Sequence, residues 1–151
     1  MGPIKHLTCG LILGTGILIS EKDIMKAASC VCGATMSDID HIIEYAKYCK
    51  DYDVKPTFPE WKSGNYFTKK GTIYVIFHSW ELCAIMWFIS GTIKDVKINS
   101  IINGLTLGYT SHLILDHIGN NLNNMGYFWL YRWWKKFRQN VLLERDNECV
   151  E

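Results

Sequence analysis

The sequence lacks an excess of charge of either sign. Sixteen Lys and Arg residues stand against 15 Asp and Glu residues, so the formal net charge is +1 at pH 7. A chain with so small a net charge has no strong electric field to attract a polyanion to its surface. The composition therefore carries no strong nucleic-acid signature.

The chain also lacks the paired cysteines of a zinc finger. Among its six cysteines, Cys30 and Cys32 form a C-x-C pair, and no second pair follows at zinc-finger spacing. Cys9 and Cys83 lie within apolar runs, where cysteine behaves as a small hydrophobic residue. Reduced thiols are typical of the cytosol. We therefore expect a cytoplasmic protein, with membrane association as the open alternative.

No segment shows the alternation of apolar and polar residues, closed by hairpin turns, that is typical of β-strands. The apolar runs predict an all-α fold instead, and 151 residues fit one domain. We expect a single-domain bundle of five to six helices over residues 1–139, with a metal site between helices and a polar tail at 140–151. The expected helices cover residues 5–19, about 20–32 (ended by Gly33), 42–50, 72–90, 96–119 and 127–139, with a loop at 51–70.

Two segments keep membrane association open. Residues 72–93 are long enough to span a bilayer, and His78 and Glu81 are their only acidic, basic or histidine residues. A central helix buried in the bundle fits the same pattern. Residues 126–136 mix aromatic and basic side chains, as segments at a membrane interface do. The alternative is that Trp129 and Trp133 pack this last helix onto the core, with its bases in solvent.

Five histidines lie in or beside apolar segments, most with an acidic residue within one turn. They are His6, His41, His78, His112 and His117. His112 and Asp116 are spaced i and i+4, which places both on one face of a helix with apolar residues between them. A buried aspartate is costly unless a cation or hydrogen-bond donors compensate it. This pair therefore indicates a metal ligand set.

Glycines accompany two of these histidines. Gly104 and Gly108 precede His112 by two turns and one turn, and Gly10 and Gly14 follow His6 at successive i+4 steps. A glycine lowers helix stability by about 1 kcal/mol relative to alanine. The repetition therefore predicts two helices whose backbones approach closely and bring their histidines together.

Two further groups offer nitrogen and oxygen ligands. Asp38, Asp40 and His41 form a compact group at a helix start, and His78 lies one turn before Glu81. In the alternative interpretation the two aspartates cap the following helix, and His78 with Glu81 is a buried pair. Nitrogen and oxygen ligands without thiolate suit zinc, manganese, iron or nickel, and a carboxylate-rich set can hold two ions.

At these residues the chain resembles the membrane-bound metal-dependent hydrolase family (the YdjM-like proteins). More distantly it is similar to the zinc-dependent phospholipase C and single-strand nuclease superfamily. Four motifs occur in the family's order over about residues 6–117: His6 before Gly10, the run 33–41 (GATMSDIDH), His78-Ser79, and the run 108–116 (GYTSHLILD). Ser37 replaces the family's usual proline. The family's His-Arg-Gly run before His78 is absent, which leaves Lys69 or Lys70 as candidates for a basic anchor.

The resemblance implies an all-helical fold and a hydrolase that cleaves a small-molecule or lipid phosphoester. It also implies metal ligation by His6, one or both of Asp38 and Asp40, His78, His112 and Asp116, with zinc as the foremost candidate, as one or two ions. Glu81 is then a candidate general base. His41 and His117 are candidates for orienting ligands or protonating a leaving oxygen.

Two other functions compete with a YdjM-like hydrolase. One is a non-catalytic helical bundle, with or without membrane association, whose buried polar groups pair with one another. The other is an HD-type phosphohydrolase, which is also helical. The HD type is the weaker match because the chain offers only Asp40-His41 and Asp116-His117, the reverse of the His-Asp order that such enzymes carry.

Overall fold

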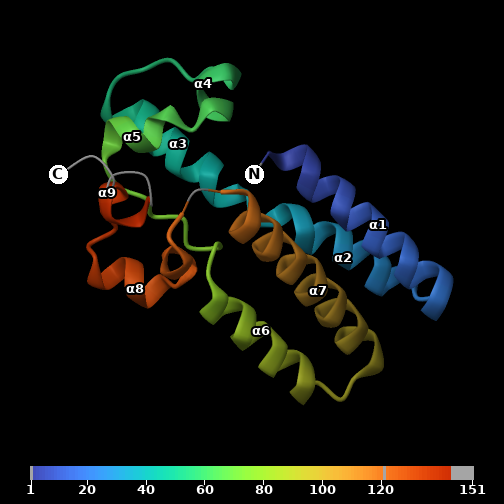
Figure 1. Ribbon diagram of the computed structural model, residues 1–151. Coiled ribbons are helices and arrows are strands. Elements are labelled where there is room, and N and C mark those ends of the chain that lie inside the picture. The colour runs from blue at the N-terminus through green and yellow to red at the C-terminus, as the bar shows by residue number, and fades with distance from the viewer. Residues whose placement is uncertain (1, 121, 144–151) are drawn as a thin grey trace. The chain divides into compact units, whose positions relative to one another are not determined.

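The computed structural model describes residues 2–120 and 122–143, and every extended regular element in that part of the chain is helical (Figure 1). The all-α prediction is confirmed. The only strand-like features there are two isolated bridges, Thr72 with Arg138 and Leu122 with Leu143. The helices are α1 (Pro3–Glu21), α2 (Ile24–Met36), α3 (Ile39–Asp51), α4 (Phe58–Ser63), α5 (Asn65–Lys70), α6 (Trp80–Thr92), α7 (Val96–Gly119), the 3-10 helix η1 (Asn124–Tyr127), α8 (Trp129–Trp134) and α9 (Gln139–Leu142).

The helices belong to two compact units. The first holds α1, α2, α6 and α7, and the second holds α3, α4, α5, η1, α8 and α9. The chain passes from one unit to the other at Ser37–Asp38 and again at His78–Ser79. Both boundaries lie inside the single domain that the sequence predicted over residues 1–139.

In the first unit, α1, α2 and α7 pack through backbone contacts at glycines. A Cβ on Gly108 would collide with the carbonyl oxygen of Cys30, and one on Gly33 would collide with that of Leu105. A Cβ on Gly10 would lie 2.8 Å from the Cβ of Ala34. The prediction that the two glycine-bearing helices approach each other through their glycines is wrong, because the glycines of α1 and of α7 both contact α2. The two histidines nevertheless meet, as predicted, with their rings stacked. The prediction that α2 ends at Gly33 is wrong, because this glycine serves the contact with α7 and the helix continues to Met36.

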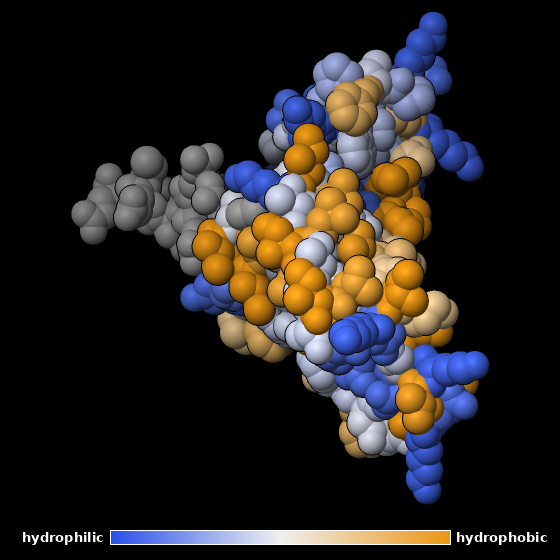
Figure 2. Space-filling model, turned by 90° about the vertical axis from the view of Figure 1, so that its right-hand side faces the viewer, coloured by the Kyte–Doolittle hydropathy of each residue, from blue (hydrophilic) through white to orange (hydrophobic). Residues whose placement is uncertain are grey.

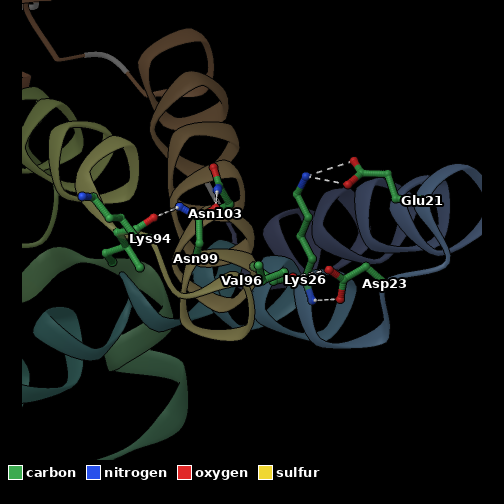
Figure 3. Close-up of a pocket in the computed structure, with 9 residues that line it drawn as sticks. Glu21, Asp23, Lys26, Lys94, Val96, Asn99 and Asn103 are labelled. Atoms are coloured by element: carbon green, nitrogen blue, oxygen red, sulfur yellow. Dashed lines mark hydrogen bonds and ion pairs between the residues drawn. The ribbon is translucent and has the colours of Figure 1, made fainter.

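The start of α2 shows how the helix ends of this unit are satisfied (Figure 3). The helix begins at Ile24 and not near residue 20, because Asp23 is its N-cap and accepts a hydrogen bond from the backbone N–H of Lys26 at 2.9 Å. The hydroxyl of Ser100 also donates to Asp23. These hydrogen bonds lower the pKa of the Asp23 carboxyl. Lys26 Nζ pairs with Glu21 at 2.7 Å. The polar groups in this hollow therefore compensate one another.

The helix predicted over residues 72–90 is shorter than expected. α6 begins at Trp80, after Ser79 caps it by accepting from the N–H of Leu82, and it has 13 residues. Such a helix is about 20 Å long, short of the roughly 30 Å that a bilayer core requires. Only Cys83 and Ser90 are buried in it. The prediction of one helix over residues 72–93 is therefore wrong in both forms, as a membrane-spanning helix and as a buried central helix.

One described helix, α1, is long and apolar enough to cross a membrane. It has 19 residues, and less than a fifth of its apolar part is buried. Its buried positions are His6, Gly10 and Gly14, while Ile4, Ile12 and Ile19 are exposed. The helix lies at the right of Figure 1, the side that faces the viewer in Figure 2, where hydrophobic residues cover a broad area.

The second unit has two small cores. Tyr45, Tyr48, Cys49 and Tyr66 form one between α3 and α5, and Ile73, Val75 and Leu142 form the other. The loop predicted over residues 51–70 contains α4 and α5. The helix predicted over 127–139 is interrupted instead, with η1, α8 and α9 in sequence. Because Leu142 is fully buried, the polar tail does not begin at residue 140. The predicted tail over 144–151 lies outside the described residues.

Candidate metal centre

The first unit brings three predicted ligands together at the start of α1 and the end of α7. His6, His112 and Asp116 are all buried, and the two imidazole rings stack with centroids 3.8 Å apart. His6 Nε2 lies 3.1 Å from Asp116 Oδ1, and His112 Nε2 lies 3.4 Å from Asp116 Oδ2. Ligand atoms bound tetrahedrally to one zinc ion at about 2.0–2.2 Å lie roughly 3.3–3.6 Å from one another. The observed separations are close to this range and are also those of ion pairs.

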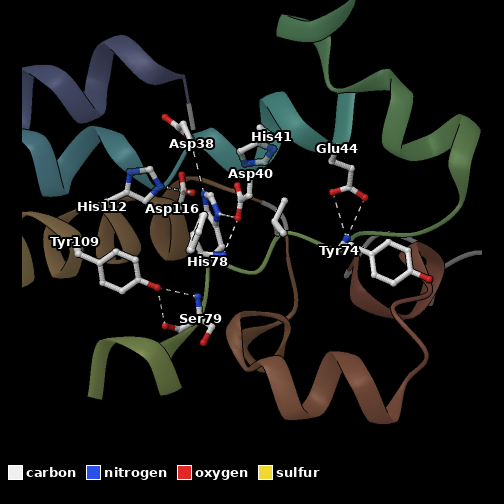
Figure 4. Close-up of polar contacts among 12 residues, drawn as sticks. Asp38, Asp40, His41, Glu44, Tyr74, His78, Ser79, Tyr109, His112 and Asp116 are labelled. Carbon is white, nitrogen blue, oxygen red and sulfur yellow. Dashed lines mark hydrogen bonds and ion pairs between the residues drawn. The ribbon is translucent and has the colours of Figure 1, made fainter. Parts of the chain in front are cut away.

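The backbone of α2 fixes the orientation of the His112 ring. His112 Nδ1 donates a hydrogen bond to the carbonyl oxygen of Ala34 at 2.9 Å. A carbonyl can only accept, so Nδ1 carries the proton and Nε2 presents its lone pair beside Asp116 (Figure 4). Metal-binding histidines are held in this way by a partner on their other nitrogen.

His6 has no such partner. Neither of its ring nitrogens makes a hydrogen bond within the described part of the chain, and the side chain is 0% exposed. Its Nε2 is close enough to Asp116 for a hydrogen bond, at 3.1 Å, but the contact fails the directional requirement of one. Buried polar groups without hydrogen bonds are rare and call for an explanation. A cation beside Asp116 that takes a lone pair of His6 would supply it.

The second unit brings together Asp38, His41 and His78. One ligand atom from each lies within 4.8 Å of the other two. Asp38 Oδ1 is 3.8 Å from His78 Nε2, and the rings of His41 and His78 meet edge to face at 4.7 Å. These separations are wider than those in an occupied metal site, so ligation would draw the three side chains together. Asp38 makes no capping hydrogen bond at the start of α3, so the capping alternative fails for it.

The carboxylate of Asp40 orients the ring of His78 through a hydrogen bond. Its Oδ2 accepts hydrogen bonds from His78 Nδ1 at 3.1 Å and from the N–H of Phe77 at 2.8 Å, which directs His78 Nε2 toward Asp38 (Figure 4). Burial alone would raise the pKa of Asp40, but the hydrogen bond and charge of His78 and the charge of His41 outweigh burial and lower it. Asp40 Oδ1 makes no hydrogen bond within the described residues, so the predicted ligand role stays a prediction.

Tyr66 holds His41 in the same manner. The Tyr66 hydroxyl donates to the His41 carbonyl oxygen at 3.4 Å and lies 3.3 Å from His41 Nδ1. Burial and then the charge of Glu44 raise the pKa of Tyr66, so the phenol keeps its proton. When the phenol donates its hydrogen bond to the carbonyl, Nδ1–H of His41 can donate to the phenol oxygen, and Nε2 is left for a ligand. The sequence suggested an orienting or proton-donating role for His41, and the structure places it among the candidate ligands.

The segment that carries His78 is extended and is held by side chains from other elements of its unit. Arg132 of α8 is 1% exposed and donates to the carbonyl oxygens of Val75 and, at 2.7 Å, of His78. Glu44 of α3 accepts from the N–H of Tyr74 at 3.1 Å and binds Lys70 Nζ at 2.9 Å. Arg132 was expected in solvent. Sequence gave no signal for it, because 54 residues separate it from His78.

Glu81 and His117, the remaining predicted catalytic residues, lie in the first unit. Glu81 is in the first turn of α6, where it accepts a hydrogen bond from the Ser79 hydroxyl at 3.0 Å. His117 is in the last turn of α7, with its ring edge-on to Trp80 at 6.2 Å. The catalytic roles of both residues stay predictions.

Each unit thus holds one cluster of predicted ligands, and the prediction that these residues form one metal site with one or two ions stays a prediction. A scan against protein-family models gives no match for the chain. Searches of curated proteins and of solved structures give no significant match either. The resemblance to the YdjM-like family therefore rests on the four motifs alone.

Proposed function

We propose that this protein is a metal-dependent hydrolase that cleaves a small-molecule or lipid phosphoester, with zinc as the preferred metal. The observation that carries the proposal is the buried cluster in the first unit. There, His112 is turned by the Ala34 carbonyl so that Nε2 faces Asp116, while His6 is buried without a hydrogen bond to any described residue. An imidazole buried in this way is costly unless another group, such as a cation, compensates it.

The ligand chemistry supports a divalent cation in each unit. His6, His112 and Asp116 supply nitrogen and carboxylate donors in one, and Asp38, His41 and His78 supply them in the other. A bound divalent cation would polarise a phosphoryl oxygen and activate water at neutral pH. In this proposal Glu81 accepts the proton of the attacking water and His117 protonates the leaving oxygen. Manganese, iron and nickel are compatible with the same donors.

Metal analysis of the purified protein tests the proposal. We expect protein prepared without added metal to retain close to one zinc or more per chain, and His112→Ala to bind zinc at least about tenfold more weakly. Ser111→Ala is the matched control, because Ser111 neighbours His112 on α7 but its hydroxyl donates to the backbone of Gly108. Negligible metal in wild-type protein and in both variants, even after zinc is added back, would end the proposal.

An activity screen then separates the hydrolase from a protein that only stores or senses metal. Chromogenic phosphomonoesters and phosphodiesters would be assayed with zinc, manganese, iron and nickel. Turnover that is lost in His112→Ala and kept in Ser111→Ala supports hydrolysis. Metal binding without turnover of either ester class would leave a metal-binding protein and remove the hydrolase.

The second candidate is a non-catalytic helical bundle associated with a membrane. The exposed apolar face of α1 favours it, because Ile4, Ile12 and Ile19 are 75%, 67% and 73% exposed. Contiguous exposed apolar surface on this scale is typical of membrane or protein contact. Recovery of the chain in a detergent-free supernatant would argue against membrane residence. Recovery in a membrane fraction without bound metal would favour the bundle over the hydrolase.

A further inference from the structure

The outer side of α8 exposes large apolar side chains. Leu130, Trp133 and Trp134 are 61%, 64% and 70% exposed. We call these three residues, together with Lys135 and Lys136 of the following turn, the α8 surface. The alternative in which Trp133 packs into the core and the bases face solvent is wrong at its central point. The tryptophans face outward, and the base that is buried is Arg132.

The bases of the α8 surface lie beside its aromatic rings. Lys135 Nζ sits over the Trp134 ring at 4.1 Å and over the Tyr131 ring at 5.7 Å. A lysine in this position keeps its ammonium group in the polar layer above an aromatic platform. Indole rings next to ammonium groups are the combination that proteins place at the boundary between lipid headgroups and acyl chains.

The stretch of sequence that contains the α8 surface is basic. Residues 117–143 contain no Asp or Glu, whereas Glu144, Asp146, Glu148 and Glu151 follow in the last eight residues. The same stretch contains four basic residues, Arg132, Lys135, Lys136 and Arg138. Of these, Lys136 and Arg138 are exposed. A surface that is both apolar and locally cationic complements an anionic lipid bilayer.

The choice of bases favours lipid over a protein partner. Protein interfaces are enriched in Arg and depleted of Lys. Here Arg132 is turned inward to backbone carbonyls, and the two bases within the α8 surface are lysines, with one exposed arginine, Arg138, beyond it. Lysine binds phosphate groups as a simple point charge, which suits lipid headgroups that have no fixed arrangement.

We propose that the α8 surface docks onto the headgroup region of an anionic lipid bilayer. Leu130, Trp133 and Trp134 enter the boundary between headgroups and acyl chains, while Lys135 and Lys136 bind lipid phosphates. The proposal does not depend on metal binding or hydrolysis. It also holds whether or not α1 enters a bilayer, because it concerns only the second unit.

Vesicle partitioning of the full chain tests the proposal, with backbone hydrogen exchange of residues 129–138 as a local readout. Vesicles of phosphatidylcholine alone are compared with vesicles that contain 30% phosphatidylglycerol (about one anionic lipid in three). We expect wild-type protein to partition at least about tenfold more strongly into the anionic vesicles, and to lose that preference at high salt. Exchange over residues 129–138 should slow on anionic vesicles.

Two double variants separate the contributions of the tryptophans and of the lysines to vesicle binding. Trp133→Ser with Trp134→Ser should weaken partitioning by about tenfold or more, and should abolish the slowed exchange. Lys135→Gln with Lys136→Gln should remove the preference for anionic vesicles. The matched control is Phe58→Ser, an aromatic residue on α4 of the same unit that is 67% exposed, and it should behave as wild type.

Three results would overturn the proposal. The first is equal partitioning of the wild type and the tryptophan double variant. The second is unchanged exchange over residues 129–138 on anionic vesicles, which would assign any binding to α1. The third is slowed exchange with rising protein concentration and no vesicles, which would assign the surface to a second copy of the chain. Should the tryptophan variant fail to fold, the lysine variant alone decides, because exposed lysines contribute little to folding.

Discussion

The ring orientation of three histidines in this protein is held by a partner on one ring nitrogen. The Ala34 carbonyl holds His112, the Asp40 carboxylate holds His78 and the Tyr66 hydroxyl lies against His41. Neither ring nitrogen of His6 makes a hydrogen bond within the described residues. Such partners decide which nitrogen carries the lone pair, so they decide which histidines can ligate a cation.

The residue that orients His78 can be tested without touching a histidine. In Asp40→Ala, His78 Nδ1 loses its acceptor, and we expect metal affinity to fall by about 10-fold to 100-fold. Isothermal titration with zinc measures the change, and Asp53→Ala on the exposed turn after α3 is the control. Equal zinc affinity in both variants would remove Asp40 from the support of the site.

Arg132 allows a second test at the same scale. Arg132→Met leaves the carbonyl oxygens of Val75 and His78 without their donor, and we expect a loss of about 1–3 kcal/mol in the free energy of unfolding. Urea denaturation monitored by circular dichroism gives the value. Arg138→Met, at an exposed position, should change it by less than about 0.5 kcal/mol. A similar loss in both would mean that the buried contacts contribute nothing.

Sequence identified the candidate ligands better than it identified their supports. His112 and Asp116 could be paired because i and i+4 share a helix face, and in the structure His112 Nε2 lies 3.4 Å from Asp116 Oδ2. The acceptor of His112 is a backbone carbonyl of an alanine, which leaves no trace in residue type. Tyr66 and Arg132 reach their partners across 25 and 54 positions, and no helical or strand period links such distant residues.

Glycine marked the end of one helix correctly and of another wrongly, since α7 ends at Gly119 but α2 continues past Gly33. The bounds of α7 were correct because Asp95 caps its start and the chain turns after Gly119. The error over residues 72–79 has a physical cause. Ile73 and Val75 are buried in a small core as part of an extended segment, and a short apolar run gives the same pattern in extended and helical form.

Alanine should have opposite effects on stability at two helical glycines, because one lies at the contact between α2 and α7 and the other lies in open space. Gly108→Ala places a methyl group against the Cys30 carbonyl, and we expect a loss of about 1–3 kcal/mol in the free energy of unfolding. Gly16→Ala on α1 meets no atom within 4 Å, and we expect a gain of up to about 1 kcal/mol from helix propensity. Thermal and urea denaturation measure both. An unchanged free energy of unfolding in Gly108→Ala would show that α2 and α7 can move apart without loss of stability.

At the scale of the whole molecule, metal binding should be linked to stability. Each cluster takes its ligands from more than one element of its unit, as α1 and α7 do for His6 and His112. A cation that binds only the folded chain stabilises it by about 2.7 kcal/mol at 100 times its Kd. For a chain of this size, that corresponds to a rise in Tm of about 5–10 °C.

Differential scanning fluorimetry with and without zinc measures this shift. The rise should be much smaller in His112→Ala, and a chelator should reverse it in wild-type protein. An equal rise in wild type and His112→Ala would locate zinc binding away from the first unit's cluster. No rise in either would contradict the coupling of metal binding to folding.

The backbone of α2 near Ala34 serves two neighbours on α7. The nitrogen of Ala34 lies 2.7 Å from the position that a Cβ of Gly108 would occupy. The Ala34 carbonyl accepts a hydrogen bond from His112, one turn after Gly108 on α7. Helix spacing and the tautomer of an imidazole are therefore set by the same stretch of chain. A genetic screen for loss of bound metal should return substitutions at Gly108, a position that has no donor atom to offer.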